Sequence, residues 1–197
     1  MEVIHWDQAG LLPSRKYICG YCNSPLASDR GWAGRNPPNG QIVGLIYLCH
    51  QCTRPTFIES KSGGKQVPAI TFGNSVSDIP DEGVRALYDE ARKCTGAEAY
   101  TAAVLACRKL LMHIAVSKGA NPGETFMSYV EFLAKQNYIP PDARDWVDHI
   151  RTKGNEANHD IAIMPKEDAQ ELISFLEMLL KVIFEFPAAI KKKFQNV

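Results

Sequence analysis

The chain has 197 residues, 45 % of them hydrophobic and 22 % charged, which suffices for one full domain and a small second one. Its net charge is zero, which argues against coating of nucleic acid by bulk electrostatics but leaves room for a local basic groove. It has no apolar run of about 18 residues, as a membrane span requires, and residues 1–7 do not resemble a secretory signal. We therefore expect a cytoplasmic protein without a membrane partner, in which paired cysteines are metal ligands rather than disulfides.

The sequence divides into two parts that differ in composition and in hydrophobic periodicity. Residues 1–75 are rich in glycine, proline, asparagine and serine and contain short runs typical of β-strands. Helical periodicity begins near residue 78, after the turn-rich residues 73–80, which we interpret as a short linker. The pattern predicts an α+β chain with a small β domain at 1–75 and an all-helical domain at 80–197.

Four cysteines in the β domain form two C-x-x-C pairs, Cys19 with Cys22 and Cys49 with Cys52, separated by 26 residues. Two such pairs supply four thiolates that converge on one tetrahedral ion. The spacing predicts a zinc ribbon whose closed Cys₄ site holds structural, not catalytic, Zn²⁺. A redox pair is the competing interpretation, but no thioredoxin-like βαβ pattern surrounds either pair. His50, inside the second pair, is an alternative ligand.

Short β-type runs flank both pairs, at residues 15–18, 41–48 and 55–58, and predict the strands of the ribbon. Basic and aromatic side chains alternate in this region. Such a surface could bind a nucleic-acid backbone and stack bases; the alternative is a solvated face over a small core. The basic residues are Arg30, Arg35, Arg54, Lys61 and Lys65, and the aromatic ones are Trp32, Tyr47 and Phe57.

Five helices are predicted in the second domain. Their apolar residues recur at three- and four-residue steps, which indicates one buried face on each. Cys94 and Cys107 are interpreted as small buried hydrophobic residues. The predicted helices span residues 81–93, 98–118 and 125–136, a fourth begins at Pro140, and the fifth spans 166–186, where Pro187 ends or kinks it.

The fourth predicted helix carries an unusual polar cluster. Arg151, Asn155 and His159 recur every four residues and therefore share one stripe of a helix, with Gly154 among them. Histidine can exchange a proton with a ribose hydroxyl, and arginine can stabilise negative charge on a phosphoryl group. The cluster thus suits metal-independent RNA cleavage. A buried polar network between helices, or a helix cap, would use the same residues.

This motif, Arg-x-x-Gly-Asn-x-Ala-x-His at residues 151–159, resembles a family of HEPN-related domains whose function is unknown. The likeness extends to residues 102–108 and 168–172, and members of the similar family often carry an N-terminal zinc ribbon. The resemblance implies an all-α, HEPN-like helical bundle, dimeric in many relatives.

By this resemblance, the chain is expected to be a metal-independent endoribonuclease of HEPN type in a bacterial toxin or antiviral defence system. Arg151, Asn155 and His159 would be catalytic, RNA the partner and a homodimer the assembly. The alternative is a non-catalytic module for nucleic-acid or protein binding and dimerisation. In a third interpretation the polar cluster is purely structural, so that loss of His159 would lower stability by about 1–3 kcal/mol.

Overall fold

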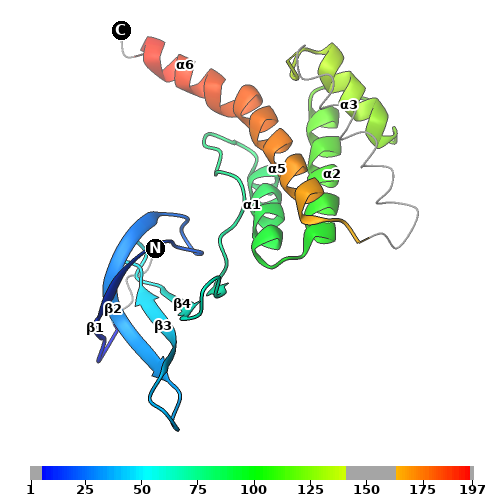
Figure 1. Ribbon diagram of the computed structural model, residues 1–197. Helices are drawn as coiled ribbons and strands as arrows, with labels where there is room; N and C mark the ends of the chain where they lie inside the picture. Colours follow the sequence, from blue (N-terminus) through cyan, green and yellow to red (C-terminus); the bar gives the residue numbers. More distant parts are fainter. Residues whose placement is uncertain (1–5, 141–162, 196–197) are drawn as a thin grey trace. The chain divides into compact units, whose positions relative to one another are not determined.

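A computed structural model of the chain describes residues 6–140 and 163–195 (Figure 1). The chain divides into two compact units, Met1–Thr71 and Phe72–Val197. The first is an antiparallel sheet and the second is helical, which confirms the α+β class and the strand region around the four cysteines. No helix among the described residues is both long and apolar enough to cross a membrane.

The first unit is a five-stranded meander in which each strand pairs with the next. Tyr47 shows how the register builds the core: it lies opposite Gly31 on one side and Thr56 on the other, and its ring is buried. Its hydroxyl donates to the carbonyl of Pro13 at 2.8 Å, which ties the first strand to the third. The strands are β1 (Gly10–Ile18), β2 (Pro25–Arg35), β3 (Ile42–Leu48), β4 (Pro55–Glu59) and β5 (Gln66–Val67).

One glycine is required by the pairing of β2 with β3. Gly31 has φ +156°, and a Cβ atom placed there would lie 1.7 Å from the carbonyl oxygen of Ile46. Any larger residue therefore collides with the backbone of the neighbouring strand. Gly10 at the start of β1 has open space around it, so not every glycine of the sheet is constrained in this way.

The second unit contains helices α1 (Glu82–Gly96), α2 (Tyr100–Ser117), α3 (Phe126–Lys135) and α5 (Lys166–Leu180), followed by α6 (Phe186–Gln195). Side-chain caps start two of them. Asp81 accepts from the backbone N–H of Val84 at 3.1 Å, and Thr125 accepts from that of Ser128 at 3.1 Å. Helices α1, α2 and α3 begin and end within a few residues of the predicted positions, and α5 begins at the predicted residue.

A single apolar core lies between these helices, with α1, α2, α3 and α5 all contributing to it. The hydrophobic cluster of the sheet shares no residue with this core. The largest fully buried side chains of the helical unit are Tyr88, Phe175, Leu110, Leu111, Ile114, Leu133, Ile173, Leu176, Leu179, Leu180 and Val130.

The turn-rich segment before α1 is bonded to the helices rather than extended as a linker. The hydroxyl of Tyr88 donates to the carbonyl of Asn74 at 2.9 Å. Glu177 of α5 accepts from both the backbone and the side chain of Asn74, at 2.8 and 3.0 Å. Val76 and Ile79 are buried in the helical core. Residues 72–80 thus form a strap across α1 and α5.

Pro187 does not end the last helix. A π-helical turn, Lys181–Glu185, ends two residues before Pro187, and the N–H of Phe186 donates to the carbonyl of Lys181, five residues back. This turn interrupts the usual four-residue ladder just before the proline, which lacks an N–H and would disturb that ladder. The chain therefore continues as α6 to Gln195.

Candidate metal centre

The first cysteine pair lies in the tight turn between β1 and β2. The backbone N–H of Cys19 donates to Ser24 at 3.0 Å, and that of Asn23 donates back to Cys19 at 2.8 Å. Asn23 closes the turn with φ +59°, a conformation that asparagine adopts more readily than most residues. The backbone N–H of Tyr21 points at the sulfur of Cys19, 3.4 Å away.

The second pair repeats this turn between β3 and β4. The N–H of Cys49 donates to Arg54 at 3.0 Å, and the N–H of Thr53 donates to Cys49 at 2.8 Å. Thr53 has the same φ of +59° as its counterpart in the first turn. The two C-x-x-C sequences therefore fold into equivalent knuckles, each at the end of a hairpin.

The two knuckles bring the four sulfur atoms together. The Sγ atoms of Cys19 and Cys52 lie 3.7 Å apart, as do those of Cys22 and Cys49, and all four lie within 4.8 Å of one another. None of these cysteines forms a disulfide. A tetrahedral ion with metal–sulfur bonds near 2.3 Å requires sulfur separations of about 3.8 Å. The arrangement is thus compatible with a bound metal such as zinc.

The four cysteine thiols of the cluster differ in how far they are buried. Cys19, Cys49 and Cys52 are buried, and Cys22 is partly exposed. Burial raises the pKa of Cys49 and brings that of Cys52 to about 12. Burial also acts on Cys22, but hydrogen bonds from Ser24, Cys52 and Cys19 together outweigh it and lower the pKa of that thiol to about 7. A cation among the sulfurs supplies the positive charge that favours the thiolate form of all four.

No histidine takes part in this cluster within the described residues. His50 lies in the second knuckle with its side chain exposed, and the four ligand atoms that converge are all sulfur. The other two cysteines are also separate from it. Cys107 is fully buried in the helical core, where burial raises its pKa, and Cys94 is half-buried beside that core.

The expected catalytic residues Arg151, Asn155 and His159 lie outside the described residues, as does the predicted fourth helix beyond its first residue, Pro140. The structure therefore brings together the four metal-ligand candidates only.

One of the basic and aromatic residues expected at the surface of the ribbon lies in its core. Tyr47 is buried and cannot stack on a base, whereas Phe57 is 37 % exposed. The guanidinium of Arg54 lies 5.1 Å from the centre of the Tyr21 ring, and that of Arg35 donates to the carbonyl of Gly40. Of the expected set, Arg30 lines a hollow beside the second knuckle.

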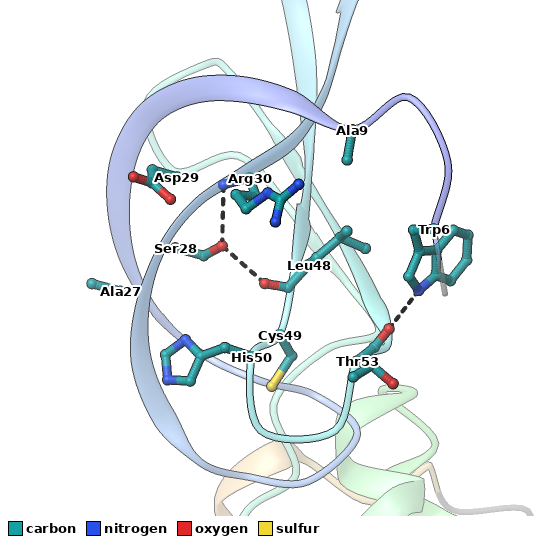
Figure 2. Close-up of a pocket in the computed structure, with 10 residues that line it drawn as sticks. All are labelled: Trp6, Ala9, Ala27, Ser28, Asp29, Arg30, Leu48, Cys49, His50 and Thr53. Carbon is teal, nitrogen blue, oxygen red and sulfur yellow. Dashed lines mark hydrogen bonds between the residues drawn. The ribbon is translucent and has the colours of Figure 1, made fainter. Parts of the chain in front are cut away.

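Sequence reasoning missed Trp6, which lines the same hollow (Figure 2). Its indole N–H donates to the carbonyl of Thr53 at 2.6 Å, and its ring meets that of Trp32 edge-on, with centres 5.7 Å apart. Trp6 lies 47 positions from Thr53 in the sequence, so no local pattern indicates this contact. An isolated tryptophan next to β-type sequence was the only available signal.

Comparison with known proteins identifies the helical unit by family. Residues 89–196, more than half of the chain, match the family described as Domain of unknown function (DUF4145). The chain belongs to this family. No curated protein and no solved structure matches it.

Proposed function

We propose that the four cysteines bind one structural Zn²⁺ ion, which makes the first unit a zinc ribbon. The sulfur separations of 3.7 Å carry this proposal, because they match a tetrahedral Zn–S₄ centre. Four sulfur ligands fill the coordination shell, so no position is left for a substrate or an activated water. The metal then stabilises a sheet whose hydrophobic cluster is small and includes the cysteines themselves.

Metal analysis of the purified protein tests this directly. We expect one zinc per chain and no visible absorption. Iron also accepts a tetrahedral set of four thiolates, but it would colour the protein. A coloured protein with stoichiometric iron, or a colourless one without metal that keeps its β structure, would contradict the zinc assignment.

We further propose that the chain acts on RNA as a metal-independent endoribonuclease of HEPN type in a bacterial toxin or antiviral defence system. Arg151 and His159 are the proposed catalytic residues, supported by Asn155. The motif at residues 151–159 lies inside the segment that matches the family, and it pairs a proton-transfer group with a phosphate-binding group. In this proposal the second unit is a HEPN-like bundle in the cytoplasm.

The decisive experiment incubates end-labelled RNA with the pure protein in buffer without divalent cations. We expect fragments that end in cyclic phosphate, and we expect His159→Ala to abolish them. His113→Ala is the matched control, because His113 lies 56 % exposed at the surface of α2 and should not affect cleavage. Unchanged cleavage by the His159 variant would refute the catalytic role.

One observation favours the alternative, a non-catalytic binding and dimerisation module. Helix α6 has no buried residue, and it exposes Phe186, Ile190 and Phe194 at four-residue intervals along one stripe. Such a stripe suits contact with a second copy of the chain. Light scattering would show a dimer that Ile190→Asp converts to a monomer. If no RNA is cleaved but this dimer forms, the module function replaces the enzymatic one.

A further inference from the structure

A hollow of about 460 Å³ lies in the ribbon unit beside the second knuckle (Figure 2). We call it the Trp6 pocket. Its size lies within the range of small-ligand sites, and one nucleotide would fit it. It is lined by Trp6, Ala9, Ala27, Ser28, Asp29, Arg30, Leu48, Cys49, His50 and Thr53.

Trp6 is held as a fixed aromatic surface at this pocket. The hydrogen bond to Thr53 satisfies its only polar group, and the edge contact with Trp32 fixes the ring from a second direction. Even so, 37 % of the residue remains exposed. An aromatic ring that is fixed in place but open to solvent can stack on a base with little loss of side-chain entropy.

The pocket also carries hydrogen-bond donors suited to phosphate. Figure 2 shows the Arg30 side chain extending from β2 toward the side of the pocket where Trp6 lies, and His50 on the opposite side. Within residues 6–140 and 163–195, no carboxylate forms an ion pair with the Arg30 guanidinium. Asp29 is the one acidic side chain of the lining. A free guanidinium near a fixed aromatic ring matches a phosphate next to a base.

Electrostatics limits the mode of binding. Residues 1–71 contain seven lysines and arginines against four aspartates and glutamates, but Zn²⁺ with four thiolates adds two negative charges. The unit is thus nearly neutral, and long-range attraction is weak. A ligand must be held by a few direct contacts, which favours a single unpaired nucleotide over a duplex backbone.

We propose that the Trp6 pocket binds one nucleotide of single-stranded RNA, with the base stacked on Trp6 and its phosphate bonded to Arg30. The choice of RNA rests on the proposed function. In this arrangement the ribbon holds the RNA strand through a site distinct from the residue 151–159 motif.

Fluorescence anisotropy with a labelled 12-nucleotide single-stranded RNA tests the site. The full-length, zinc-loaded His159→Ala variant is used throughout, so that cleavage cannot deplete the ligand. Trp6→Ala should weaken binding about 5- to 150-fold, the range for loss of one base stack. Arg30→Gln should weaken it about 10- to 150-fold, because it removes a charged hydrogen bond to phosphate. Arg35→Gln is the matched control, because Arg35 lies on the same strand but bonds to Gly40 outside the pocket; its Kd should change less than about twofold.

Zinc content and circular dichroism are measured for each variant, and Arg30→Gln carries the test if Trp6→Ala loses zinc. A shallow salt dependence, with a slope of about −0.7 to −1.4 for one or two phosphates, is also expected. Unchanged Kd in both pocket variants, equal loss with Arg35→Gln, equal affinity for duplex RNA, or no binding of RNA would overturn the proposal. Because cleavage is scored separately with the wild-type protein, failure of the pocket and failure of the nuclease are distinguishable.

Discussion

The guanidinium carbon of Arg108 lies 4.2 Å from the centre of the Phe126 ring, inside the helical unit. Arg108 is only 5 % exposed, and no described residue accepts a hydrogen bond from its Nη1 atom. Burial accordingly lowers its pKa. Arg92, 7 % exposed, is the opposite case: its guanidinium donates to the carbonyls of Phe72 and Gly73 and to the carboxylate of Asp89.

This contrast predicts opposite responses to one substitution. Arg108→Met replaces a poorly compensated buried charge with an apolar side chain of similar length. We expect the free energy of unfolding to stay equal or rise by about 1–2 kcal/mol. Urea denaturation followed at 222 nm measures it.

Arg92→Met is the matched control. It should lower stability by about 2–3 kcal/mol, because it removes three hydrogen bonds and leaves two carbonyls unpaired. A similar loss in the Arg108 variant would show that its charge is fully compensated.

The environment of Glu177 predicts that the free energy of unfolding depends on pH. Burial alone would raise its pKa, but hydrogen bonds from Asn74 and Lys181 lower it in the folded chain. The ionised carboxylate therefore stabilises the fold above the unfolded pKa of about 4.3, and this stabilisation is lost as the pH falls through the folded-state value. Glu177→Gln should cost about 1–2 kcal/mol of unfolding free energy at pH 7, and progressively less as the pH falls below the unfolded pKa.

Glu82→Gln is the control for this measurement, since Glu82 is 89 % exposed and pairs with Arg85 only at 3.6 Å. Its effect should stay within about 0.5 kcal/mol at every pH. If the change in unfolding free energy caused by Glu177→Gln is the same at pH 3 and pH 7, the charge of Glu177 does not stabilise the contact with residues 72–80.

Removal of the metal should affect the ribbon alone, because the hydrophobic clusters of the two units share no residue. A strong chelator should shift the emission of Trp6 and Trp32 to the red in a Trp146→Phe background, and should leave the helical signal at 222 nm largely intact. Cys52→Ser should lose zinc, whereas Cys94→Ser, outside the cluster, should retain it. Retention of stoichiometric zinc by the Cys52 variant would count against the four-cysteine site.

Gly31→Ala should disrupt the pairing of β2 and β3. Its Cβ would lie 1.7 Å from the carbonyl oxygen of Ile46, so the strands must separate. We expect the free energy of unfolding of the ribbon to fall by about 3 kcal/mol or more. Gly10→Ala, with nothing near its Cβ, should change stability by less than about 0.5 kcal/mol. Thermal unfolding followed by tryptophan emission compares them, and similar midpoints would contradict the prediction.

Sequence patterns predicted those features of the structure that depend only on residues close together in the chain. The C-x-x-C spacing predicted the cysteine cluster, because each knuckle is a turn of a few residues. Helices α1, α2 and α3 were located from their apolar periodicity, which a buried face imposes directly. Such features need no knowledge of distant contacts.

The features that were missed depend on long-range contacts. Residues 73–80 have the composition of a linker, yet Asn74 finds its partner in Glu177, 103 positions away. Tyr47 was grouped with exposed aromatic residues, although its register opposite Gly31 and Thr56 turns it into the core. Pro187 was expected to end or kink its helix; it does not end it, because the chain passes through a π-helical turn and continues as α6.

The strap at residues 72–80 also decides where a stand-alone helical fragment must begin. A fragment cut at residue 80 would keep every predicted helix but would lose the carbonyls that Arg92 and Tyr88 bond and the amide groups that Glu177 accepts from. Two charged side chains would then face the core boundary without these partners, and the fragment would be prone to aggregate. A fragment that starts at residue 72 keeps them all, which makes it the better choice for crystallisation and for NMR.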